Sequence, residues 1–66
     1  MTTGDVLRTD EMRPVLVVAI THDTQGNKVL LERLDRRPRE HRTYYRCKAE
    51  VDHYPTWPEG VPYATA

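Results

Sequence analysis

The chain has 66 residues, in which ten lysines and arginines balance ten acids, and it contains one cysteine. A domain of this length buries only about 60% of its unfolded surface, so its core is small, and one cysteine excludes an intramolecular disulfide. The composition also argues against a membrane span, because the apolar run at 15–20 is far shorter than the roughly 20 residues required.

The neutral total hides a strong polarity. The segment 33–48, RLDRRPREHRTYYRCK, contains seven basic residues and two acids, whereas the remaining positions contain three basic residues and eight acids. The basic segment also carries two adjacent tyrosines. This distribution indicates an anionic partner without identifying its class.

Residues 1–13 form a polar N-terminal arm with scattered apolar side chains. The arm could form a short helix capped by Asp5, an edge strand, or a loosely ordered end, because termini order poorly unless other segments hold them.

The clearest predicted element begins at Pro14 and continues as a β-branched apolar strand over 15–20. Asp23 and Gly26 occupy the first and fourth positions of a type I turn, which predicts a three-residue hairpin loop with a G1 bulge. In that register Ile20 faces Leu30 and Leu16 faces Leu34. Both faces of the hairpin are then largely apolar near the turn, and a sheet that is apolar on both faces requires cover on both, which indicates an interface.

After a basic loop over 36–42, residues 43–53 alternate with a period of two, as in a half-exposed strand. The pattern predicts a third antiparallel strand with Tyr45, Cys47, Ala49 and Val51 on the apolar side and Tyr44, Arg46 and Lys48 on the exposed side. Cys47 is therefore expected to be a small buried hydrophobic residue.

The C-terminal segment contains three prolines between Tyr54 and Tyr63 and the single Trp57, so a regular helix or central strand is excluded there. We expect this tail to lie extended on the sheet. The predicted fold class is all-β or small α+β: a three-stranded antiparallel meander with a short N-terminal helix or strand as an option. The predicted organisation is an arm at 1–13, a β domain at 14–54 and a Pro/aromatic tail at 55–66.

Candidate binding residues lie in the basic segment, and Trp57 is a candidate apolar anchor for a partner. Arginines bind phosphate bidentately, and an exposed tyrosine offers a stacking surface for an unpaired base. The alternatives are a basic patch for an acidic protein, or a solvated loop whose arginines pair with the chain's own acids. The candidates are Arg36, Arg37, Arg39, Arg42, Tyr44, Arg46 and Lys48.

No catalytic triad, phosphate-binding loop or metal-ligand pair is present in the sequence, so we expect no enzyme activity, no cofactor, no metal and no small-molecule substrate. The absence of a signal-like segment and the single cysteine indicate a cytoplasmic protein. The bias toward arginine over lysine is typical of high-GC coding and fits a bacterium or phage.

The stretch VLVVAITHDTQGNKVLLERLDRRP resembles the opening hairpin of Nudix hydrolases. That resemblance covers about a third of the chain. It would imply a Mg²⁺-binding helix with an Arg-Glu and Glu-Glu signature, but Arg39-Glu40 stands without the following glutamate pair. No catalytic residue is carried over.

The leading hypothesis is a small non-enzymatic interaction module that binds a larger protein or a second copy of itself. The alternative is a nucleic-acid-binding domain that uses an Arg/Tyr patch at residues 33–48. The neutral total charge favours the first hypothesis, because dedicated nucleic-acid binders usually carry a basic excess.

Overall fold

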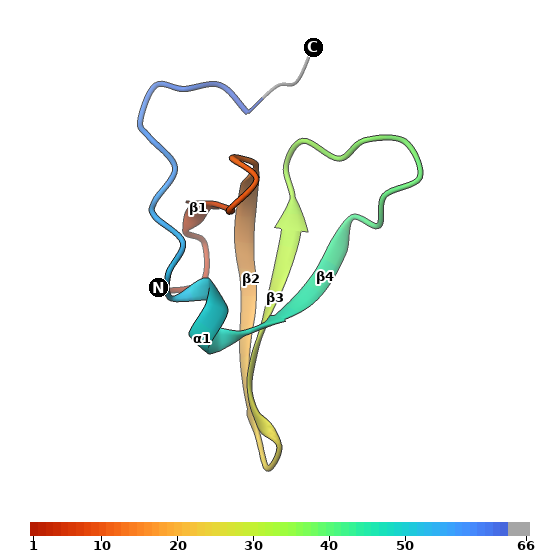
Figure 1. Cartoon of the computed structure of the whole chain (residues 1–66), viewed down its shortest axis with the longest axis vertical. Coiled ribbons are helices and arrows are strands. Elements are labelled where there is room, and N and C mark those ends of the chain that lie inside the picture. Colours follow the sequence, from red (N-terminus) through yellow and green to blue (C-terminus); the bar gives the residue numbers. More distant parts are fainter. Residues whose placement is uncertain (64–66) are drawn as a thin grey trace.

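The computed structural model describes residues 1–63, and its architecture is a four-stranded antiparallel meander with one short helix (Figure 1). The strands are β1 (Val6–Arg8), β2 (Pro14–Asp23), β3 (Gly26–Arg33) and β4 (Thr43–Cys47), and the helix is α1 (Lys48–Val51). The strands are ordered β1-β2-β3-β4 in the sheet. The predicted fold class is therefore confirmed, and the N-terminal arm contributes an edge strand.

The β2–β3 hairpin differs from the predicted register by one residue. Asp23 pairs with Gly26, so the loop contains two residues rather than three, and Ile20 lies opposite Val29 instead of Leu30. The Asp23 side chain closes the turn by accepting a hydrogen bond from the Gln25 amide at 2.9 Å, and Gly26 takes a φ of 125°. Asp23 thus forms an Asx turn, and the loop lacks the extra residue of the predicted G1 bulge.

A second irregularity lies within β2, where the register shifts between Val17 and Ala19. Val17 pairs with Leu31 and Ala19 with Leu30, which leaves Val18 as the inserted residue of a bulge. The predicted pairing of Leu16 with Leu34 is wrong, because Leu16 lies opposite Glu32. Beyond the bulge, the apolar side chains of both strands return to a common face.

That common face, which we call the inner face, carries the only core cluster of the described residues. It combines side chains of β1, β2, β3 and α1, all less than 5% exposed: Leu7, Val15, Val17, Val29, Leu31 and Val51. Ile20, Tyr44 and Tyr54 pack against the cluster and are partly buried.

The predicted third strand is shorter than expected and its two sides are reversed. Tyr44 and Arg46 pair with Leu31 and Val29, so they lie on the inner face, whereas Tyr45 pairs with Leu30 on the opposite, outer face. Tyr45 is 56% exposed. Cys47 lies on the outer face with Tyr45 and is also exposed, so its predicted burial is wrong.

The chain leaves the sheet after Cys47 because residues 48–51 form a helical turn. Lys48, Ala49 and Glu50 are good helix formers, the Asp52 amide donates to the Lys48 carbonyl at 2.8 Å, and the Lys48 ammonium pairs with Asp52 at 3.1 Å. The turn carries Val51 to the inner face, where it is 1% exposed. Val51 is therefore buried, as expected, but through helical rather than strand geometry.

The tail lies along the free edge of β1 rather than across a face of the sheet (Figure 1). Leu7 and Thr56 form an antiparallel bridge, and the Trp57 amide donates to the Val6 carbonyl at 2.8 Å. The Trp57 indole is half-buried and donates to the Val61 carbonyl at 2.9 Å. Residues 64–66 of the predicted tail lie outside the described residues.

Candidate functional site

The basic loop is held in place by one arginine that precedes β2, the strand next to β3. Arg13, just before β2, binds both oxygens of Asp35 at 3.0 and 3.1 Å and both oxygens of Glu40 at 2.6 Å. The Asp35 side chain is only 2% exposed, so this pair is buried. We call these three residues the Arg13 clamp.

The charge state of the Arg13 clamp follows from these contacts. Hydrogen bonds from the Arg13 guanidinium, followed by one from the Arg37 amide, lower the pKa of Glu40 to about 2. The two carboxylates raise the pKa of Arg13, so this cation stays charged at any physiological pH. Glu40 and Arg13 are therefore both ionised at neutral pH.

The Arg13 clamp also orders the loop that it holds. The Arg37 amide donates to Glu40 at 2.8 Å, the Glu40 amide donates to the Arg37 carbonyl at 3.1 Å, and Arg39 adopts a left-handed φ of 70°. Both acids of the basic segment are thus engaged by Arg13. The loop presents its arginines from a defined turn.

Four of the sequence-predicted residues lie on this loop and form what we call the arginine loop: Arg36, Arg37, Arg39 and Arg42. All four are exposed. Among residues 1–63 none of them forms an ion pair, since every ion pair there uses Arg13, Arg46 or Lys48. The alternative in which these arginines pair with the chain's own acids therefore has no support within the described residues.

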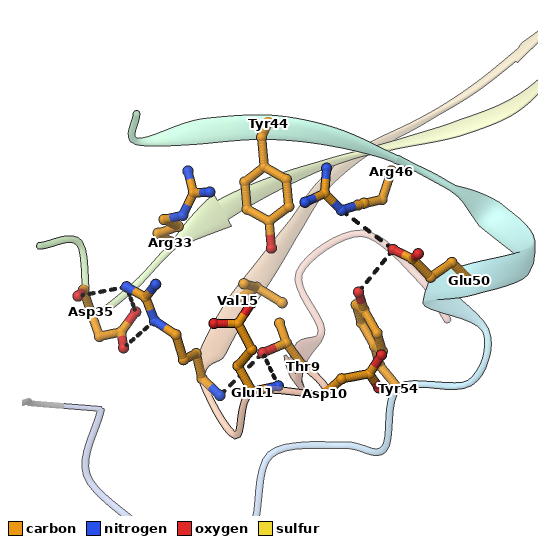
Figure 2. Close-up of a pocket in the computed structure, with 11 residues that line it drawn as sticks. Thr9, Asp10, Glu11, Val15, Arg33, Asp35, Tyr44, Arg46, Glu50 and Tyr54 are labelled. Carbon is orange, nitrogen blue, oxygen red and sulfur yellow. Dashed lines mark hydrogen bonds and ion pairs between the residues drawn. The ribbon is translucent and has the colours of Figure 1, made fainter. Parts of the chain in front are cut away.

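Two further predicted residues, Tyr44 and Arg46, lie on the opposite side of β4 from the one expected. Figure 2 shows the Tyr44 ring between the guanidinium groups of Arg33 and Arg46, which lie 4.1 and 4.7 Å from its centroid. Burial raises the pKa of Tyr44. Both ring faces are occupied by cations, so Tyr44 has no free surface on which a base could stack.

Tyr44 borders a cleft on the inner face with a volume of about 200 Å³. Within it, Glu50 accepts contacts from Arg46 at 3.3 Å and from the Tyr54 hydroxyl at 3.1 Å (Figure 2). Burial and the hydrogen bond to Glu50 raise the pKa of Tyr54 to about 12. Asp35 and Glu50 in the lining are thus bound by side chains of the chain itself, whereas the exposed Asp10 and Glu11 also border the cleft.

The outer face offers a different kind of surface. One row is apolar across β2, β3 and β4, since Leu30 lies between Ala19 and Tyr45, and Val6 pairs with Leu16 in the neighbouring row, which continues with Glu32 and Thr43. Val18 at the bulge and Tyr45 are exposed by 39% and 56%. No segment of residues 1–63 forms a second layer over this face (Figure 1).

The arginine loop and the outer face are neighbours in the fold. The loop joins the ends of β3 and β4, and the pair formed by Glu32 and Thr43 separates it from the Leu30–Tyr45 pair. The remaining predicted residue, Trp57, lies at the β1 edge, where its ring meets Tyr63 at 6.1 Å between centroids. Lys48 is paired with Asp52. The structure thus brings the arginines of the loop together and leaves Trp57 and Lys48 elsewhere.

Three residues of these sites were not singled out by sequence reasoning. Arg13, Arg33 and Glu50 come from separate segments, and no local motif links them. The signal that could have pointed to Arg13 is weak: it is an isolated cation beside the first long strand. Only its burial, with a side chain 13% exposed, reveals its role.

Comparison with protein-family models, curated proteins and solved structures finds no match to this chain. Within the described residues, no helix has the length and apolar character that crossing a membrane demands. In that same part of the chain, no three His, Cys, Asp or Glu side chains are grouped so that they could hold a metal ion.

Proposed function

We propose that the protein is a non-enzymatic binding module that docks on an acidic protein through its outer face and the arginine loop. The observation that carries the proposal is the proximity of an uncovered apolar row, centred on Leu30 and Tyr45, to four arginines without ion-pair partners among residues 1–63. An apolar centre with a charged rim is the usual anatomy of a protein interface.

The partner chemistry follows from the two parts of this surface. The apolar row calls for an apolar patch of comparable size, with Tyr45 as the exposed aromatic anchor. The arginine loop calls for carboxylates at one end of that patch, because guanidinium groups pair bidentately with carboxylates. Glu32 lies between the two parts and lowers the positive potential beside the row, which favours a protein over a polyanion.

The inner-face cleft supports a non-enzymatic role. Two carboxylates of this cleft already have partners, since Arg13 binds Asp35, and Arg46 and Tyr54 bind Glu50. A general acid or base needs a group that is free to exchange a proton with substrate. The exposed thiol of Cys47 fits a reducing compartment, so the proposal places the protein in a cytoplasm, with a bacterial or phage source.

A nucleic acid is the second candidate, favoured by the same four arginines, which form no ion pair within residues 1–63. The enclosed ring of Tyr44 counts against it, because single-strand binders stack bases on free aromatic faces. This candidate leaves Tyr45 as the only stacking surface in the Tyr44-Tyr45 pair.

The test is capture from nuclease-treated lysate with the wild-type protein and four variants. We expect one acidic protein to be recovered by the wild type, lost with Tyr45→Ser and with the triple change Arg36/Arg37/Arg39→Ala, and retained with two surface changes outside the outer face, Met12→Ser and Thr24→Ala in the hairpin loop. Purified partner should then bind with a modest dependence on salt.

Two results would overturn the proposal. One is recovery that does not distinguish the outer-face and loop variants from the two control variants. The other is recovery of nucleic acid alone, with affinity falling steeply with salt and with a slope that drops by about one for each arginine removed. The second result would establish the nucleic-acid candidate instead.

A further inference from the structure

The two edges of the sheet differ in whether another segment of residues 1–63 pairs with them. At β1, the tail occupies the edge: the Arg8 amide donates to the Pro55 carbonyl at 2.8 Å, and Leu7 bridges Thr56. At β4, no segment of residues 1–63 pairs with the outward side (Figure 1). An uncovered edge presents unpaired amides and carbonyls and is a template for another strand.

The hydrogen-bond pattern shows which residues of β4 present these groups. The Arg33 amide donates to the Arg42 carbonyl at 2.7 Å, and inward-directed pairs recur at every second residue of an antiparallel ladder. Tyr44 and Arg46 therefore direct their backbone groups to β3, and Thr43, Tyr45 and Cys47 direct theirs outward. The guanidinium of Arg46 donates to the Tyr45 carbonyl at 3.1 Å, which agrees with an outward-facing carbonyl.

We infer that β4 pairs antiparallel with β4 of a second copy of this chain, about a two-fold axis at Tyr45. The two four-stranded sheets then form one continuous sheet. This assembly uses an edge, so both outer faces and both arginine loops stay available, and it does not depend on the proposed function.

The occupant is a second copy because β4 is complementary to itself in this register. At the axis, the two Tyr45 residues lie opposite one another. On either side of it, Tyr44 of one copy lies opposite Arg46 of the other, and Thr43 of one copy lies opposite Cys47 of the other. No two like charges lie directly opposite within the paired strands, a condition that favours pairing.

The backbone groups also match. The two Tyr45 residues exchange amide and carbonyl, which replaces the Arg46 contact on each carbonyl, and each Cys47 amide donates to a Thr43 carbonyl of the other copy. The Cys47 carbonyl is the one group that is committed elsewhere, because Cys47 is the N-cap of α1.

Charge layout selects the antiparallel direction. In that direction each arginine loop lies beside α1 of the second copy and its C-cap, where the two acids Glu50 and Asp52 outnumber the one base, Lys48. A parallel arrangement would instead place the two arginine loops next to one another. Repulsion between these loops disfavours the parallel alternative.

The test is disulfide trapping between the β4 strands of two copies. Thr43→Cys would lie opposite Cys47 with Cα atoms about 5.5 Å apart, inside the range of about 4.4–6.8 Å that a disulfide spans. The two native Cys47 residues would lie about 14 Å apart at 3.4 Å per residue. A disulfide between position 43 of one copy and Cys47 of the other, identified by peptide mapping, thus reports this register.

We expect Thr43→Cys in a glutathione redox buffer to form a covalent dimer at least about tenfold faster than Thr24→Cys, because paired strands raise the local thiol concentration. Thr24 lies exposed in the hairpin loop and serves as the matched control. Adding Tyr45→Pro removes an outward amide that β3 does not use, and it should abolish the rate difference.

Three results would overturn the inference: equal rates for Thr43→Cys and Thr24→Cys, a native Cys47–Cys47 dimer as the main product, or a wild-type protein that stays monomeric by sedimentation at near-millimolar concentration. If Thr43→Cys does not fold, the double variant Tyr45→Cys/Cys47→Ser tests the same axis through one symmetric disulfide. The trapped dimer should bind the acidic partner as the free chain does, which separates this outcome from that of the proposed function.

Discussion

Replacing Arg13 with methionine should remove most of the stability of the protein. The change leaves Asp35 with a side chain that is 2% exposed and without its guanidinium partner, since both of its oxygens accept from Arg13. Breaking a buried pair in this way costs about 3–5 kcal/mol. A domain of 66 residues has a total stability of only roughly 3–10 kcal/mol.

The assay is urea unfolding at neutral pH, followed by circular dichroism. We expect Arg13→Met to lower the free energy of unfolding by about 3 kcal/mol or more, and Arg8→Met, a matched change on β1, to lower it by less than about 0.5 kcal/mol. Adding Asp35→Asn to Arg13→Met should restore at least about 1 kcal/mol, because the buried charge is gone.

The reasoning would be refuted if Arg13→Met and Arg8→Met had the same unfolding free energy, or if Asp35→Asn made Arg13→Met still less stable. Either result would mean that the pair is solvated in solution. Without the Arg13 clamp, no side chain from outside the loop would hold Asp35 and Glu40 within residues 1–63.

The remaining predictions concern pH and packing. Because Arg13 lowers the pKa of Glu40 from 4.5 to about 2, Glu40 stabilises the fold above pH 4.5 and this stabilisation is lost as pH falls toward 2; acid titration of Glu40→Gln should be flatter in that window. Leu31→Ala should cost about 2–5 kcal/mol in urea unfolding, because Leu31 is fully buried. Because the pKa of Tyr54 is raised from 10.0 to about 12, the neutral Tyr54 hydroxyl stabilises the fold below pH 10, and this contribution is lost as pH rises toward 12. Tyr54→Phe should remove that loss of stability at alkaline pH. Glu50→Gln should lower the titration midpoint of Tyr54, followed by ultraviolet absorbance.

The order of elements could be predicted from the sequence because each strand has a strong local signal. The β-branched run after Pro14, the Asp23–Gly26 turn and the alternation from Thr43 are short-range features. They predict an antiparallel meander whichever residues of the strands pair with one another. The register within the hairpin is set by a loop of two residues and by the bulge at Val18, and the turn residues Asp23 and Gly26 do not distinguish a two-residue loop from a three-residue loop.

The assignment of faces failed for a related physical reason. Alternation shows that β4 has two different sides, but the side that meets the core depends on its pairing with Leu31 and Val29. Tyr44 reaches the core because Arg33 and Arg46 cover its ring, which makes an amphipathic side chain acceptable there. Tyr45 and Cys47 are the more apolar pair and yet lie outside, and their exposure is what makes the outer face and the β4 edge candidates for binding.

The central claim is that the outer face binds an acidic protein, and site-specific photo-crosslinking tests it most directly. A photoreactive phenylalanine derivative would replace Tyr45 on the outer face or, as the control, Met12, which is 66% exposed in the turn between β1 and β2. We predict that the probe at Tyr45 yields a cross-link to one acidic protein other than the chain itself, and that the probe at Met12 does not. Equal cross-linking from both positions, or capture of nucleic acid alone, would contradict the account.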